Sequence, residues 1–80
     1  MYYTYILKSI KYANQIYIGK TPNLRARIKK HNDGGSKHTS KYKPWKLIAY
    51  FAFEKEQTSI DFERYLKSSS GKAFMNKRLI

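Results

Sequence analysis

Five polar side chains in this 80-residue chain have the types that hydrolysis of a phosphodiester bond requires. The reaction needs an activated water, positive charge beside the phosphoryl oxygens and stabilisation of the leaving alkoxide. Glu63 offers the hard carboxylate that Mg²⁺ or Mn²⁺ binds, and without an adjacent acid a single-metal site is expected. Arg27 offers a permanently charged fork for a phosphate. The candidate catalytic set is Tyr5, Tyr17, Arg27, His31 and Glu63.

Proton transfer in this set falls to the phenols and the imidazole. Tyr5 and Tyr17 are expected on adjacent strands with their hydroxyls together, although a phenol with a pKa near 10 is a poor base at neutral pH. Packing in an aromatic core is the alternative for both, because the chain has eight tyrosines. His31 can accept a proton from water or through a tyrosine relay. A helix-end histidine favoured by the helix dipole is its alternative role.

Each charged candidate also has a plain surface interpretation. Glu63 can pair with Arg64 or Lys67, and Arg27 can be a solvated cation on a helix. Arg25 lies two residues before Arg27, so the two arginines point to different helix faces. We expect Arg27 to face the site and Arg25 to face the DNA backbone or solvent.

The elements that must position these side chains follow from the apolar pattern. Thr21 and Pro22 are typical of a helix start, and Thr58 with Asp61 resembles a capping box. The run from Ser68 to Gly71 is expected to end one helix before the next. The predicted order is strand 2–7, strand 15–19, helix 21–32, strand 45–53, helix 58–67 and helix 72–79. This is a small α+β fold, a three-stranded sheet flanked by three helices, in a single domain spanning residues 1–80.

Composition excludes several classes of protein. The absence of cysteine excludes disulfides and thiolate metal sites. No apolar run approaches the roughly 20 residues that cross a bilayer, and the N-terminus lacks a signal-peptide pattern, so we expect a cytoplasmic protein. Seventeen Lys and Arg against five Asp and Glu give a net charge of +12. Nucleic acid is the expected partner, because cation–phosphate contacts release counterions, whereas no basic segment has the apolar face of a membrane anchor.

The residues expected to contact DNA lie mainly in the loop before the third strand, where Tyr42 and Trp45 offer stacking surfaces. The chain has no base-reading helix and no zinc finger, which predicts weak sequence preference. Recognition of branches, flaps or ends, or targeting by a protein partner, would then select the substrate. The DNA-binding candidates are Lys20, Arg25, Lys37, Lys41, Lys43 and Lys72, extended by Lys46, Lys77 and Arg78.

The segments Tyr3-Thr4-Tyr5 and Tyr17-Ile18-Gly19 carry a resemblance to a known family. With Arg27 ten residues beyond Tyr17, and Glu63 opening Glu63-Arg64-Tyr65-Leu66-Lys67, they resemble the motifs of GIY-YIG nuclease domains in order and spacing. The similarity covers essentially the whole chain and is to the small single-domain type, like the N-terminal domain of excinuclease C. The first motif keeps its final tyrosine and departs from the family name at Tyr3 and Thr4.

The resemblance implies a metal-dependent DNA endonuclease with Mg²⁺ or Mn²⁺ at Glu63, related to DNA repair or recombination. It also implies that one tyrosine is the base or positions the water. Gly19 is expected to be structural, because close packing there needs a missing side chain. Asn76 resembles a terminal asparagine that supports the site.

Two other functions fit part of the sequence. A non-catalytic nucleic-acid-binding module on the same fold is favoured by Tyr3 and Thr4 in place of the usual glycine and isoleucine. A basic ribosome- or RNA-associated protein would explain the charge but leave the motif spacing to coincidence. The enzyme hypothesis makes a geometric prediction: the five candidate side chains converge on one open concave face, with Glu63 facing Arg27.

Overall fold

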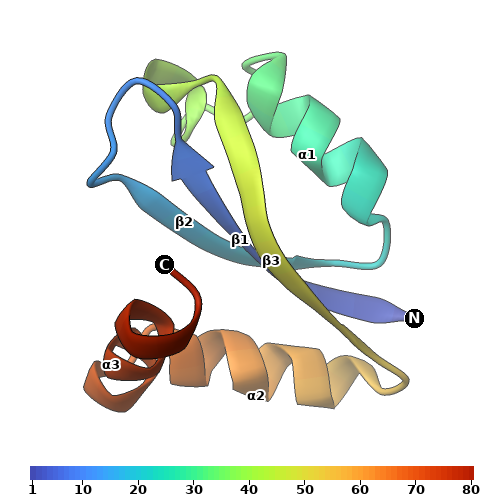
Figure 1. Cartoon of the computed structure of the whole chain (residues 1–80). Coiled ribbons are helices and arrows are strands. Elements are labelled where there is room, and N and C mark those ends of the chain that lie inside the picture. Colours follow the sequence, from blue (N-terminus) through green and yellow to red (C-terminus); the bar gives the residue numbers. More distant parts are fainter.

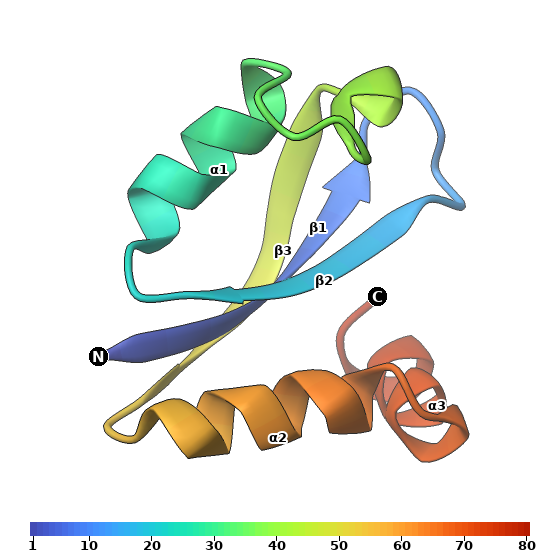
Figure 2. The same ribbon diagram turned by 180° about the vertical axis from the view of Figure 1, so that it is seen from behind.

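The N-terminal strand is the middle strand of a three-stranded antiparallel sheet in the computed structural model, which describes residues 1–80. One helix covers one face of the sheet and two helices cover the other (Figure 1, Figure 2). None of the helices has the length and apolar character needed to cross a membrane. The elements are β1 (Tyr2–Ser9), β2 (Ile16–Thr21), α1 (Leu24–Asn32), a 3₁₀-helix (Ser40–Tyr42), β3 (Trp45–Phe53), α2 (Glu56–Leu66) and α3 (Ser69–Arg78). The predicted fold class is confirmed.

The register of the sheet determines which residues face α1. Tyr5 of β1 pairs with Gly19 of β2 on one side and with Tyr50 of β3 on the other. Because side chains alternate along a strand, Tyr3 and Tyr5 point to the α1 face, whereas Ile6 points to the α2 face. The strand order β2-β1-β3 leaves β2 at an edge of the sheet.

Each face of the sheet has its own apolar core. On the α1 face, three buried residues pack with apolar side chains of that helix. On the α2 face, buried residues of β1 and β2 pack with side chains of α2 and α3. The α1-side core contains Tyr5, Leu7 and Trp45, and the α2-side core contains Ile6, Ile18, Leu66 and Met75.

The starts of α1 and α2 differ from the sequence-based prediction. Asn23, rather than Thr21, caps α1, since its Oδ1 accepts a hydrogen bond from the Ala26 N–H at 3.1 Å. The Thr21 hydroxyl instead accepts a hydrogen bond from the Asn23 N–H, which turns the chain into the helix. Helix α2 begins at Glu56, two residues before Thr58, with no side-chain cap. The Glu56 carboxylate in the first turn is favoured by the helix dipole, and the predicted capping box of Thr58 and Asp61 does not form.

The joint between α2 and α3 depends on a glycine. The Ser68 hydroxyl accepts a hydrogen bond from the Gly71 N–H at 3.2 Å and so caps α3, which therefore starts three residues earlier than predicted. A Cβ on Gly71 would collide with the carbonyl oxygen of Tyr65 and the backbone of Leu66. The two helices can meet this closely only because position 71 has no side chain.

Candidate active site

A buried hydrogen-bond network joins a side chain of β1, a side chain of α1 and a side chain of the loop that follows α1. The Tyr5 hydroxyl is 2.9 Å from His31 Nε2, and His31 Nδ1 is 2.7 Å from the Thr39 hydroxyl. Tyr5 is 0% exposed and His31 is 1% exposed, so neither contacts bulk water. Both ring nitrogens of His31 are therefore held in place, one from β1 and the other from the loop after α1.

Burial determines the protonation states of Tyr5 and His31 in this hydrogen-bond network. It raises the pKa of the Tyr5 phenol well above its ordinary value; nearby Tyr17 and Glu63 raise it further, and Arg27 opposes them. Burial also lowers the pKa of His31, and the positive charges of Arg27 and Lys30 lower it further. At neutral pH a protonated phenol thus lies beside a neutral imidazole, which can accept a proton.

Gly19 gives the Tyr5 side chain its space. A Cβ on Gly19 would lie 2.5 Å from the Tyr5 hydroxyl oxygen, 2.7 Å from Tyr5 Cζ and 2.9 Å from Tyr17 Cε2. The end of the Tyr5 ring therefore passes directly over β2 where that strand lacks a side chain. The structural role predicted for this glycine has a specific physical cause here.

Tyr17 is the tyrosine of the pair that reaches the surface. It is only partly buried, and its ring centroid lies 6.1 Å from that of Tyr5 and 4.7 Å from that of His31. The centroid of the exposed His38 imidazole lies 6.4 Å from the centroid of the Tyr17 ring. A depression of about 310 Å³ opens in front of it, lined by Ile16, Tyr17, Ile18, His38, Lys67 and Lys72.

A second depression lies at the other end of β2. It has a volume of about 110 Å³, and its polar lining includes Lys20 and Arg27 on one side and Glu56 and Ser59 of α2 on the other. Both depressions therefore take residues from β2, from the α1 side and from the α2 side. The edge of β2 that they follow runs between α1 above and α2 below in Figure 2.

Glu63 occupies the middle of this edge. It lies on α2 one helical turn after Ser59 and one turn before Lys67, hence between the residues that line the two depressions. Its carboxylate oxygen Oε2 lies 3.1 Å from the Lys67 ammonium group. Arg27 and Glu63 form no ion pair with each other. They belong to α1 and α2, which cover opposite faces of the sheet.

The acidic side chains of this region determine whether a divalent cation can bind here. No three His, Cys, Asp or Glu side chains lie together as a closed metal site. The Glu63 side chain is 19% exposed, and its oxygen Oε1 makes no hydrogen bond. Mg²⁺ and Mn²⁺ bind through one or two carboxylates and take their other ligands from water and phosphate. A single, partly exposed carboxylate such as that of Glu63 fits such an ion.

The structure brings the five predicted residues together, but not all of them on an open face. Tyr17, Arg27 and Glu63 are partly exposed, whereas Tyr5 and His31 are buried beneath them. The prediction that all five line a concave surface is therefore wrong for the buried pair. Direct proton transfer from water to His31 is excluded for the same reason, which leaves a relay through a tyrosine.

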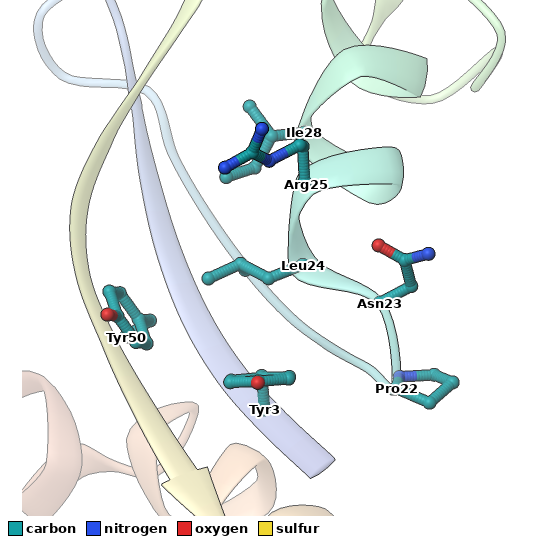
Figure 3. Close-up of a pocket in the computed structure, with 7 residues that line it drawn as sticks. All are labelled: Tyr3, Pro22, Asn23, Leu24, Arg25, Ile28 and Tyr50. Carbon is teal, nitrogen blue, oxygen red and sulfur yellow. The ribbon is translucent and has the colours of Figure 1, made fainter. Parts of the chain in front are cut away.

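The predicted DNA-binding residues are placed unequally. Lys72 lines the depression in front of Tyr17, and Lys20 lines the one that contains Arg27. Lys37, Lys41 and Lys43 are exposed in the loop before β3. Arg25 is exposed and lines neither of these depressions. It lies in a separate groove between α1 and the strands β1 and β3 (Figure 3).

The surroundings of Trp45 contradict its predicted role, whereas those of Asn76 do not test it. Trp45 is 5% exposed, and its indole N–H donates to the Thr39 carbonyl oxygen at 3.0 Å, so it cannot stack with a base. The ring packs instead in the α1-side apolar core, at the start of β3. Asn76 is exposed on α3 and makes no side-chain hydrogen bond, and its supporting role stays a prediction.

Three residues of the site have no assigned role in the sequence-based set. Lys67 lies four residues after Glu63, and that helical spacing could have identified it as a phosphate contact as well as a salt-bridge partner. His38 and Thr39 lie in a loop without regular spacing. No local signal in the sequence indicates that this loop folds back onto Tyr17 and His31.

Comparison with known proteins agrees with this arrangement. The family model described as the GIY-YIG catalytic domain matches residues 1–78. UPF0213 protein CPE1444 of Clostridium perfringens is 41% identical over 68 residues, which cover 84% of this chain and 71% of that protein. Structure-specific endonuclease subunit SLX1 of Debaryomyces hansenii is 33% identical over 73 residues, covering 82% of this chain but only 21% of the relative's length.

A solved structure is similar over most of the chain. The solution NMR structure of UPF0213 protein BH0048 of Bacillus halodurans superposes with a TM-score of 0.57 at 32% sequence identity. The match covers 96% of this chain and 84% of that one. The family resemblance seen in the motifs is thereby confirmed by sequence and by fold. The chain belongs to the GIY-YIG catalytic-domain family of nucleases.

Proposed function

We propose that this chain is a metal-dependent DNA endonuclease that hydrolyses a phosphodiester bond at the edge of β2. One observation carries the proposal. Arg27 of α1 and Ser59 of α2 line one depression along β2, Tyr17 and Lys67 line the other, and Glu63 lies on α2 between Ser59 and Lys67. A cation for the phosphate, a carboxylate for a metal ion and a phenol facing solvent thus meet around one small region.

The charges along β2 support a bound polyanion. Lys20 and Arg27 lie at one end of the edge, and Lys67 and Lys72 lie at the other, with Glu63 between them. A phosphodiester backbone following this edge would meet cations on both sides of the scissile bond. The net charge of +12 draws such a backbone toward the protein from any direction.

The residues of the chain divide the chemistry between them. Arg27 neutralises the charge that develops on the phosphoryl oxygens. Tyr17 positions the attacking water, and the buried Tyr5–His31 pair behind it provides a neutral imidazole for the released proton. Glu63 would hold the divalent ion, with one oxygen already free of hydrogen bonds. When bound, Mg²⁺ or Mn²⁺ there supplies Lewis-acid stabilisation of the phosphoryl and leaving oxygens.

The relatives direct the choice of substrate. The SLX1 relatives are named structure-specific endonuclease subunits, and this chain spans 21% and 31% of the length of two of them. We infer that this chain also selects DNA by shape, in repair or recombination, and that a protein partner can add targeting. The absence of a base-reading helix agrees with selection by shape rather than sequence.

Cleavage of end-labelled duplex, flapped and branched DNA with Mg²⁺ or Mn²⁺ tests the proposal. The wild-type chain should give metal-dependent products, and both Glu63→Gln and Arg27→Ala should lose them while still binding DNA. Glu54→Gln is the matched control, because Glu54 is exposed in the connection between β3 and α2. It should cleave like the wild type.

The same experiment separates the alternatives. Binding by every form without any cleavage would assign the chain to the non-catalytic DNA-binding module instead. Cleavage that survives Glu63→Gln would show that Glu63 is not the metal ligand of the reaction.

A further inference from the structure

A groove of about 500 Å³ lies between α1 and the strands β1 and β3, outside the proposed active site. Tyr3 and Tyr50 rise from the two neighbouring strands, and Leu24 extends from the helix toward them (Figure 3). The guanidinium group of Arg25, the residue after Leu24 in α1, also extends over this groove (Figure 3). The lining residues used below are Tyr3, Pro22, Leu24, Arg25, Ile28 and Tyr50.

The two tyrosines form an aromatic corner. Their ring centroids are 6.0 Å apart and the rings are inclined at 63°, so no flat molecule can lie sandwiched between them. Tyr50 is 53% exposed, whereas Tyr3 is partly buried. A flat aromatic ligand therefore stacks on Tyr50, with Tyr3 packed edge-on behind it and Leu24 and Ile28 as an apolar wall.

The charge of the groove and its position select the class of ligand. Its single charged side chain is Arg25, and no acidic residue lines it. Pro22 lines both this groove and the depression that contains Lys20 and Arg27. A nucleic acid strand bound at Arg27 can thus continue past Pro22 and place its next nucleotides at the tyrosines.

We propose that this groove binds an unpaired nucleobase of the DNA substrate, stacked on Tyr50, with its phosphate at Arg25. The proposal rests on the proposed nuclease function and adds its substrate class: DNA with a single-stranded segment beside the cleavage site. It also gives a use to Tyr3, which stands where the first family motif is named for a glycine. Bases in a duplex are already stacked on both faces, so only an unpaired one can enter.

Equilibrium binding of the full chain to fluorescent DNA tests this subsite. Three probes are compared: a blunt duplex, the same duplex with a short single-stranded flap, and that flap with abasic nucleotides, which keep the phosphates without the bases. The wild-type chain should bind the flap about 5- to 150-fold more tightly than the abasic flap, which corresponds to about 1–3 kcal/mol for stacking of one base on an aromatic ring. Tyr50→Leu should abolish that preference, and Tyr50→Phe should retain it.

Tyr12→Leu is the matched control, because Tyr12 is also exposed but lies in the β1–β2 turn. It should bind all three probes like the wild type. Arg25→Gln should weaken binding to the flap and to the abasic flap equally and lower the salt dependence of binding by about one phosphate contact. Thermal melting of each variant verifies that it is folded.

Cleavage of the flapped and abasic-flap DNA with Mg²⁺ or Mn²⁺, measured in parallel, keeps this proposal distinct from the nuclease function. Loss of base preference in Tyr50→Leu without any cleavage by the wild type would support the subsite and overturn the nuclease. Equal binding of the flap and the abasic flap by a wild type that cleaves DNA would overturn the subsite. The groove would then be free for an apolar segment of a protein partner.

Discussion

Replacing Gly19 by alanine should damage stability and activity together. The added Cβ would lie 2.5 Å from the Tyr5 hydroxyl oxygen and 2.7 Å from its Cζ. The Tyr5 ring cannot move aside, because it is fully buried and its hydroxyl is hydrogen-bonded to His31 at 2.9 Å. The strain must therefore be relieved by shifting β2 or by breaking that hydrogen bond.

The expected cost follows from these contacts. Overpacking a buried site costs about 1–3 kcal/mol, and loss of the Tyr5–His31 hydrogen bond adds about 1 kcal/mol. Removing a glycine from a strand returns about 0.5–1 kcal/mol of backbone entropy. The free energy of unfolding should fall by about 2 kcal/mol in total, which lowers Tm by about 8–16 °C for a domain of this size. Displacement of the tyrosines by about 1 Å should also reduce cleavage about 100-fold.

Thermal melting and the DNA cleavage assay measure both effects. Gly35→Ala is the milder control, since its Cβ would lie 2.9 Å from Cγ of the exposed, movable Lys30 side chain and 3.3 Å from the Lys30 carbonyl oxygen, which a small shift relieves. Combining Gly19→Ala with Tyr5→Phe removes the nearest contact atom and should recover part of the lost stability, but not the activity. If Gly19→Ala melts and cleaves like Gly35→Ala, Tyr5 does not lie over β2 as described.

Three further predictions concern the buried histidine and the joint between α2 and α3. Burial lowers the pKa of His31 below the value of 6.5 that it has when unfolded, so the unfolded chain binds more protons. The contribution of His31 to stability should be complete above pH 6.5 and decline as the pH falls toward the folded pKa. The plot of Tm against pH should therefore be flatter for His31→Gln than for the wild type. An unchanged plot would refute this. Gly71→Ala should lower the free energy of unfolding more than Gly35→Ala does, because its Cβ meets the Tyr65 carbonyl oxygen; urea unfolding tests this. Ser68→Ala should cost about 1 kcal/mol as a lost helix cap, while Ser69→Ala in the same denaturation assay should cost almost nothing.

The sequence predicted the order of the elements because their apolar patterns are strong. The third strand, residues 45–53, is found within the predicted bounds, since its apolar run is continuous. The helix starts were less predictable, because several capping residues stand next to one another. Thr21 and Asn23 are both good caps, and only the turn made by the Thr21 hydroxyl decides between them.

The residues of the site were predictable from their types, but their exposure was not. The motif spacing brought Tyr5 and His31 into the candidate set, yet nothing local indicates that Thr39 and the core around Trp45 seal them from water. That depends on a loop whose path is set by tertiary contacts. The role of each tyrosine can be separated only when burial is known, because their side chains are chemically identical.

The position of β1 in the middle of the sheet has a consequence for the newly made chain. The middle strand is synthesised first, but its partner β3 is complete only at Phe53, and Glu63 and Lys72 follow later still. Domains assemble on the ribosome as their segments emerge, at about 5–20 residues per second. Tyr5, Tyr17 and Arg27 therefore leave the ribosome before Glu63, the residue proposed to hold the metal ion. The proposed site can be complete only after α2 has emerged and packed against the sheet.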